Sequence, residues 1–219
     1  MNTRLNFDSN LKQLKDMLVD MARKSENAIK ESIDTLINQD IEKAKEIINN
    51  DTIIDELEHE INNKAIILIA KESPVAGDLR KIIVALKISS EVERIADNAV
   101  NIAKSTLHIG KEKHIKKIVD IPKMMNLALE MLSDSLKAFL TEDVDLARKC
   151  AEKDDKVDEM YGRLIKELME YIQKYPSQTN QITQLAFVCR YIERLGDHST
   201  NIAEHVIYLV TGQRFDLNA

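Results

Sequence analysis

Two stretches decide the fold of this 219-residue chain: ERIADNAVNIA at residues 93–103 and ERLGDHSTNIA at residues 193–203. They lie 100 positions apart and are identical at six of eleven positions, whereas unrelated segments would share about one. Apolar residues in both stretches recur at spacings of three and four, which is typical of a helix packed on a core. The repetition indicates an internal duplication, with the same helix present once in each half.

A second repeat lies upstream of these helices, at an offset of 103 residues. Asp40, Ala44, Asp51, Asp55 and Glu56 map onto Asp143, Ala147, Asp154, Asp158 and Glu159. A difference of three residues between the turns that join the helices reconciles the two offsets. The duplication therefore extends over two consecutive helices in each half.

The spacing of apolar residues along the whole chain predicts three long helices in each half. In the first half they are expected over about 11–36, from a cap at Asp40 to the Ser73-Pro74 stop, and from Asp78 to Gly110. In the second half they are expected over about 118–140, 143–175 and 178–210. The predicted fold class is all-α: six long antiparallel helices in two tandem three-helix bundles, with repeats at residues 1–110 and 118–219. The basic segment 111–117 between them is expected to be a solvated joint.

The composition agrees with long helices and excludes several classes of protein. Only 5 Gly and 3 Pro occur, with 4% aromatic residues, against about 7% Gly and 5% Pro in ordinary proteins. So few turn formers exclude an all-β fold and leave little room for a βαβ fold. The formal charge of −6 argues against a nucleic-acid partner, because binding to phosphate backbones needs a basic surface.

The chain is expected to be soluble and intracellular. Its longest uncharged apolar run, residues 65–70, is six residues long, whereas a transmembrane helix needs about 20. The N-terminus has no apolar stretch typical of a signal peptide. Cys150 and Cys189 are isolated, so they are expected to be small buried apolar residues in a reducing cytosol.

The duplication preserved acidic pairs at positions i and i+4. The pairs are Asp51/Asp55 and Glu93/Asp97 in the first half, and Asp154/Asp158 and Glu193/Asp197 in the second. Such neighbours repel each other by about 0.2–0.5 kcal/mol per pair unless a counter-charge is present. In each half the two pairs lie about 20 residues on either side of the turn between the helices, which places them at one level of an antiparallel hairpin. Four carboxylates are therefore expected to converge in each half, where a bound cation would offset their repulsion.

Oxygen-only ligands favour hard or borderline cations over the Cys/His zinc type of site. The candidate ions are magnesium, manganese, calcium, ferric or ferrous iron, and zinc, and each cluster could bind more than one ion. Asn101 and Asn201 lie one turn further along and can donate hydrogen bonds to the ligands. The alternative is that Arg94 and Arg194 neutralise the pairs as surface salt bridges.

Other candidate motifs carry less weight. Glu56 and His59 have the Glu-x-x-His spacing of carboxylate di-iron bundles, but the second half contains no counterpart. His198, whose counterpart is Asn98, is expected to be a polar surface residue rather than a ligand. The chain contains no nucleophile–base motif and no phosphate-binding Gly-rich loop, so no catalytic residue is predicted.

At these motifs the chain resembles the PhoU family of phosphate-signalling regulators. The matching parts are the turn PVAGDLR at residues 74–80, LKI at 86–88 and the duplicated ERxxDxxxNIA. The resemblance implies that the four acidic pairs bind multinuclear metal clusters at the surface. PSQTN at residues 176–180 replaces the turn in the second half, so any role of Asp78 and Arg80 belongs to one half. A helix cap is the alternative role for Asp78.

The resemblance also implies a function: a phosphate-specific transport accessory protein that represses the phosphate-starvation response. The implied partners are a sensor histidine kinase and the ATPase of a high-affinity phosphate ABC transporter, which would bring a cytoplasmic protein to the inner membrane face. A homodimer is compatible with the sequence but no pattern supports it. A carboxylate-bridged metalloenzyme or metal-storage bundle is the alternative, and it requires inward-facing ligands that include His. A helical scaffold without metal is the third interpretation.

Overall fold

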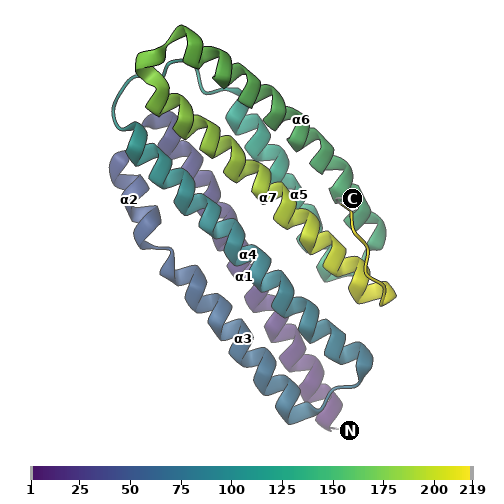
Figure 1. Cartoon of the computed structure of the whole chain (residues 1–219). Helices are drawn as coiled ribbons and strands as arrows, with labels where there is room; N and C mark the ends of the chain where they lie inside the picture. Colours follow the sequence, from purple (N-terminus) through teal and green to yellow (C-terminus); the bar gives the residue numbers. More distant parts are fainter. Residues whose placement is uncertain (1, 218–219) are drawn as a thin grey trace.

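A computed structural model describes residues 2–217 of the chain, with side chains from residue 6 onward. Within this range the protein consists of helices and connecting loops, without strands. The helices are α1 (Asn2–Asn38), α2 (Ile41–Asn49), α3 (Thr52–Glu72), α4 (Ala76–Ile109), α5 (Asp120–Thr141), α6 (Val144–Lys174), the short 3-10 helix η1 (Pro176–Gln178) and α7 (Thr179–Thr211). The predicted all-α fold of two three-helix bundles is confirmed, with the second long helix divided into α2 and α3 (Figure 1).

Helix caps mark the boundaries that the sequence predicted. The carboxylates of Asp40 and Asp143 each accept a hydrogen bond of 3.0 Å, from the backbone N–H of Lys43 and of Leu146 respectively. These two residues are equivalent in the duplication, so the same capping signal starts the second helix of both halves. Gly110 ends α4 with a positive φ of 69°, a conformation that glycine adopts without strain.

The predicted second helix is not continuous, because it breaks at Asn50 and Asp51. The backbone N–H of Asn50 caps α2 on the carbonyl of Glu46, and α3 begins at Thr52. Residues 49–52 are Asn-Asn-Asp-Thr, whose side chains compete for backbone hydrogen bonds and favour helix ends. The equivalent segment 152–155 is Glu-Lys-Asp-Asp and stays helical within α6. Asp51 therefore lies at a helix break, whereas Asp154 lies inside a helix.

The predicted N-cap at Asp78 is wrong, because α4 begins at Ala76 and its N-cap residue lies three positions before Asp78. Val75 is the N-cap residue and its side chain makes no capping hydrogen bond. Asp78 lies in the first turn of the helix. There its negative charge interacts favourably with the positive end of the helix dipole.

The helices form two layers around a shared core. Figure 1 shows α3, α4, α7 and α6 side by side in the nearer layer, with α1 behind α4 and α5 behind α7. α4 and α7 are antiparallel, because Arg80 near the start of α4 contacts Leu209, while His108 near its end accepts from Asn180. One continuous apolar cluster joins residues of both halves, so the two bundles do not have separate cores.

The segment between the halves is solvated at residues 111–113 and 117, as expected, but it is also anchored at residues 113–115. Ile115 donates its backbone N–H to Gln181 Oε1 at 2.7 Å, and Gln181 Nε2 donates to the carbonyl of Lys113. The ring of His114 bonds to the carbonyl of Leu36 at 2.8 Å. Gln181 itself is buried at the start of α7. These bonds connect the loop to both halves of the molecule.

Arg80 fastens the other end of the α4–α7 contact. Its Nη1 donates to the carbonyl of Leu209 at 3.4 Å, and its guanidinium lies 5.5 Å from the centre of the Tyr208 ring. Gly212 follows α7 with φ of 73°, and a Cβ atom there would lie 3.0 Å from Arg80 Nη1. A cation at this position offsets the negative end of the helix dipole. Arg80 thus has a role in one half only, as its absence from the second turn predicted.

Replacement of Arg80 by Ala is expected to loosen this contact. Loss of the hydrogen bond, the ring contact and the charge at the end of α7 should reduce the free energy of unfolding by about 1–2 kcal/mol. For a chain of this size that corresponds to a fall in Tm of about 2–8 °C. Thermal unfolding followed by circular dichroism measures it. Arg148→Ala, at an exposed site on α6, is the matched control, and an equal fall in both variants would contradict the role of Arg80.

Candidate metal centres

The four acidic residues of the first half converge between α3 and α4, as the sequence predicted. Burial raises the pKa of Asp51, and repulsion from Asp55 and Asp97 raises it further. Burial likewise raises the pKa of Glu93, with added repulsion from Asp97 and Asp55. Each of these carboxylates therefore feels the charge of residues on the opposite helix. Asp97 is exposed and the other three are partly buried.

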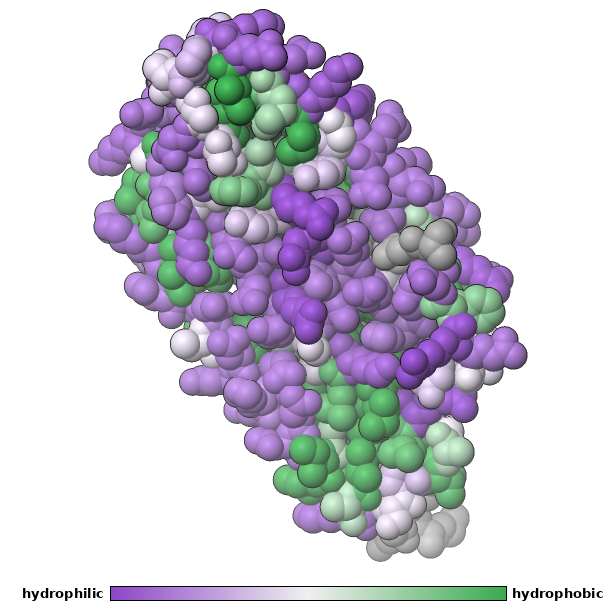
Figure 2. All heavy atoms as spheres, in the orientation of Figure 1, coloured by the Kyte–Doolittle hydropathy of each residue, from purple (hydrophilic) through white to green (hydrophobic). Residues whose placement is uncertain are grey.

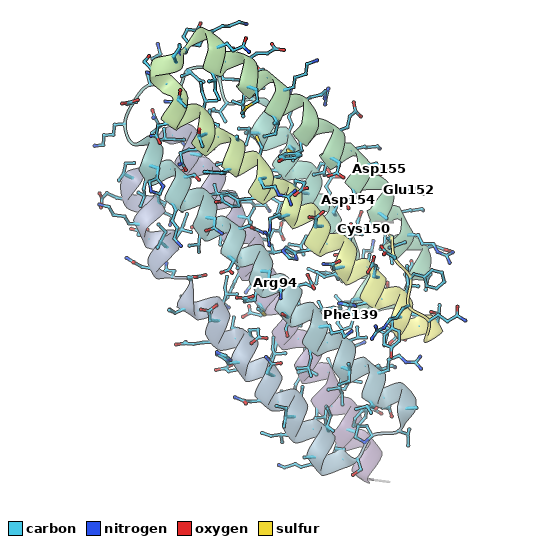
Figure 3. All side chains as sticks on the ribbon, viewed as in Figure 1. Arg94, Phe139, Cys150, Glu152, Asp154 and Asp155 are labelled. Atoms are coloured by element: carbon cyan, nitrogen blue, oxygen red, sulfur yellow. The ribbon has the colours of Figure 1, made fainter. Side chains whose placement is uncertain are left out.

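The second half holds a deeper version of the same cluster between α6 and α7. Asp154 is only 7% exposed and Glu193 only 8%. Burial raises the pKa of Asp154 from 3.8 to about 6, although a hydrogen bond from Thr200 acts to lower it. Burial and repulsion from Asp197 raise the pKa of Glu193 from 4.5 to about 7. Asp158 is exposed, and burial and repulsion from Asp197 raise its pKa as well. Figure 3 shows Asp154 on α6, on the side that faces α7.

Two carboxylate oxygens of this deeper cluster lack partners. Asp154 Oδ1 and Glu193 Oε2 are buried without a hydrogen bond among the described residues. A buried unpaired acceptor costs about 1–3 kcal/mol, and more when it carries a charge. Oxygen atoms with free lone pairs and a shared negative charge suit a hard cation. The donor set of the second half therefore fits a metal ion.

The four carboxylates of each cluster do not surround a common point at which one metal ion could bind. Over the described part of the chain, no three His, Cys, Asp or Glu side chains are placed to hold one metal ion together. The structure thus brings each predicted set of four carboxylates to one level without arranging it as a finished coordination sphere.

Two residues that the sequence analysis did not single out draw Asp154 inward. Thr200 Oγ1 donates to Asp154 Oδ2 at 2.9 Å. Gly196 leaves space for the same carboxylate, because a Cβ at this position would lie 2.7 Å from Asp154 Oδ1. The first half has Val100 and Ala96 at the equivalent positions. Comparison of the two copies of the repeat could have identified Gly196 and Thr200, because the copies differ at these positions.

The alternative interpretation, in which Arg94 and Arg194 form salt bridges with the acidic pairs, finds little support, although the charge of Arg94 acts to lower the pKa of Glu93 and of Asp97. Glu193 forms an ion pair with Arg190, one turn earlier on α7. No ion pair within 4.0 Å is found for Arg94 or Arg194 among the residues with described side chains. The counterpart of Arg190 in the first half is Ser90, so the ion pair belongs to one cluster only.

His198 and Asn201 bind across the two halves instead of serving a cluster. His198 is 6% exposed, so its prediction as a surface residue is wrong, because α4 covers it. Its Nδ1 donates to Glu91 Oε2 at 2.7 Å, and Asn201 Nδ2 donates to the same oxygen at 3.2 Å. Burial acts to raise the pKa of Glu91, but these two bonds hold it below its ordinary value. Glu91 thus provides an ionic hydrogen-bonded contact between α4 and α7.

The remaining candidate residues are the two cysteines and the Glu56 and His59 motif. Cys150 and Cys189 are buried as predicted, and burial raises the pKa of each thiol to about 12. Glu56 and His59 are exposed on α3, so their motif faces away from the core. No helix in residues 2–217 is both long and apolar enough to cross a bilayer.

These features define a class of protein: a duplicated all-α protein with a matched set of carboxylates on each three-helix bundle. The PhoU domain model matches residues 18–106 and again residues 121–206. The chain belongs to the PhoU family.

Similar proteins cover almost the whole chain. The phosphate-specific transport system accessory protein PhoU homolog of Clostridium acetobutylicum is 42% identical, over 99% of both chains. The homolog of Aquifex aeolicus is 40% identical, over 93% of this chain and 92% of its own. The crystal structure of the phosphate transport system regulatory protein PhoU from Streptococcus pneumoniae has a TM-score of 0.89 at 29% identity, over 96% of this chain and 99% of that one.

The raised pKa of Asp154 predicts how the metal-free protein responds to pH. Its carboxyl group ionises near pH 4 when unfolded but near pH 6 when folded, so the folded state is progressively disfavoured as pH rises from 4 to 6 and stays so at pH 7. The effect is on the order of 2 kcal/mol. In chelator, Asp154→Asn should therefore be more stable than the unsubstituted chain at pH 7.5 but not at pH 4.5.

Thermal unfolding at both pH values measures this difference. Glu152→Gln, at an exposed site on the same helix, controls for removal of any one negative charge from α6. A gain in Tm at pH 7.5 that is the same for both variants would contradict the assignment to the buried carboxyl group.

Proposed function

We propose that this chain is a regulatory accessory protein of a phosphate-specific transport system, with metal ions bound on its two carboxylate clusters. Family membership and relatives of that name along the full chain support the accessory role. The main support for bound metal is that one carboxylate oxygen of Asp154 and one of Glu193 are buried without a hydrogen-bond partner in the described part of the chain. A regulatory role places the protein in the cytoplasm, where a high-affinity transporter exposes its ATPase and a membrane sensor kinase its catalytic part.

Eight residues would hold the metal ions, four in each half. They are Asp51, Asp55, Glu93 and Asp97 between α3 and α4, and Asp154, Asp158, Glu193 and Asp197 between α6 and α7. A bound ion supplies positive charge and a coordination bond to each oxygen, without any need for redox or bond-making chemistry. Iron, manganese, magnesium and zinc are all compatible with oxygen donors of this kind.

The two clusters would serve as fixed docking points on one face. α3, α4, α7 and α6 lie in a single layer (Figure 1), and the shared core behind them limits relative movement of the halves. Figure 2 shows a hydrophilic band across the middle of this face, with apolar patches near its two ends. A partner such as the transporter ATPase or the sensor kinase would bind this band with an affinity that depends on its charge. Loading with metal would change that charge without a change of fold.

The alternative, a metalloenzyme or a storage bundle, predicts ligands that point into the bundle. Asp154 and Glu193 are buried, but Asp97 and Asp158 are exposed and the motif of Glu56 and His59 faces outward. The positions of these side chains favour a surface platform over an enclosed reaction site.

Elemental analysis of protein purified without chelator tests the metal clusters. The unsubstituted chain should retain metal. The double variant Asp55→Ala with Asp97→Ala should lose the metal bound by the first cluster. The double variant Asp158→Ala with Asp197→Ala should lose the metal bound by the second cluster. Glu56→Ala with Glu159→Ala removes equivalent exposed carboxylates and serves as the control. Unchanged metal content in both cluster variants would show that the carboxylates are not the ligands.

A deletion strain tests the regulatory role. We expect the phosphate-starvation genes to be expressed in high phosphate when the gene is deleted, and expression to be repressed again by the unsubstituted chain. The cluster variants should restore repression only in part, at protein levels checked by immunoblot. Full repression in the deletion strain would contradict the regulatory role, whatever metal the purified protein contains.

A further inference from the structure

A polar hollow of about 340 Å³ opens between α4 and α7, where the two halves meet. Hydrogen-bond donors from both halves line it: Arg94, Asn98 and Asn101 from α4, and Tyr191 and Arg194 from α7. Figure 3 shows Arg94 near the middle of α4. The hollow therefore lies at the contact between the central helices of the two halves.

The internal duplication provides a counterpart with which to compare it. At an offset of 100 residues, Asn98 corresponds to His198, Asn101 to Asn201, and Tyr191 to Glu91. On the counterpart side the Glu91 carboxylate accepts hydrogen bonds from both His198 and Asn201, at 2.7 and 3.2 Å. One side of the α4–α7 contact thus contains an anion that the chain itself supplies.

The hollow lacks that anion, because Tyr191 stands where Glu91 would be. Asn98 is 3% exposed, and its Nδ2 has no hydrogen-bond partner among the described residues. A buried donor without a partner costs about 1–3 kcal/mol. An acceptor that enters from outside would remove this cost.

Two arginines at the hollow favour a charged acceptor, although Glu93 and Asp97 line it as well and balance their charge when no metal is bound. Arg94 and Arg194 are equivalent residues from the two halves, both exposed, and neither forms an ion pair with a described side chain. Two guanidinium groups bind an oxyanion through paired N–H donors. A tetrahedral anion offers oxygens to both arginines and to Asn98 at once, whereas a carboxylate has only two.

We propose that this hollow binds inorganic phosphate, in the place that the Glu91 carboxylate occupies on the counterpart side. The proposal deepens the proposed function, because it gives an accessory protein of phosphate transport its own contact with phosphate.

The first carboxylate cluster also contributes to the hollow, because Glu93 and Asp97 line it from α4, on the same helix as Arg94. Their charges repel an anion unless a cation neutralises them. Metal in the first cluster should therefore raise the affinity for phosphate, and phosphate should raise the affinity for metal by the same factor. This coupling rests on the proposed metal binding, whereas the phosphate site rests on the hollow alone.

Equilibrium dialysis of the full chain with radiolabelled orthophosphate tests the site, at fixed ionic strength, with Mg²⁺ or with chelator. Tyr191→Glu should restore the missing carboxylate and weaken phosphate binding by about tenfold or more, and Arg194→Gln should weaken it by a similar factor. Arg148→Gln, at an exposed site on α6, should leave binding unchanged. Circular dichroism of each variant confirms that the fold is retained.

The outcomes separate this proposal from the metal clusters. Orthophosphate that fails to bind the unsubstituted chain, or binds both hollow variants as tightly as the control, overturns the phosphate site. Displacement by acetate in preference to sulfate also overturns it and assigns the hollow to a carboxylate. Binding that the hollow variants weaken, but that Mg²⁺ does not change, supports the site and counts against metal in the first cluster.

Discussion

The antiparallel packing of α4 against α7 is the contact on which the rest of the structure depends. Arg80 closes one end of this contact on the carbonyl of Leu209, and Asn180 closes the other on the carbonyl of His108. Between them, Glu91 binds His198 within the interface. With both central helices fixed in this way, each half can place its outer helix, α3 or α6, against the exposed side of a central one. The carboxylate clusters form at those outer contacts.

Much of this arrangement follows from local sequence, and the rest depends on contacts between halves. Helix periodicity and the caps at Asp40 and Asp143 predict the elements, and counting residues from each turn predicts that the acidic pairs lie level. The burial of His198 was missed because it depends on which helix of the other half covers it. The break at Asn50 was open to prediction from its poor helix formers, but a strong apolar pattern on both sides concealed it.

The duplicated halves have diverged at the residues that set the depth of each cluster. Thr200 and Gly196 draw Asp154 toward α7, whereas Val100 and Ala96 offer Asp51 neither a hydrogen bond nor extra space. A continuous helix holds Asp154 in place, and a helix end holds Asp51. Equal motifs therefore give unequal environments, because burial and local hydrogen bonds set the energy of a carboxylate as much as its position does.

The order of charges across one face links the clusters to the hollow. Arg94 and Arg194 line the hollow between α4 and α7 together with Glu93 and Asp97, and the two sets of four carboxylates belong to the outer contacts, α3 with α4 and α6 with α7. Without metal, the outer groups screen the central positive charge from an approaching anion. A divalent cation on each proposed cluster would offset two negative charges there, so the repulsion of an anion would be weaker. On a platform of fixed helices, occupancy of the proposed clusters would therefore change how strongly this face repels an anion, without any change of fold.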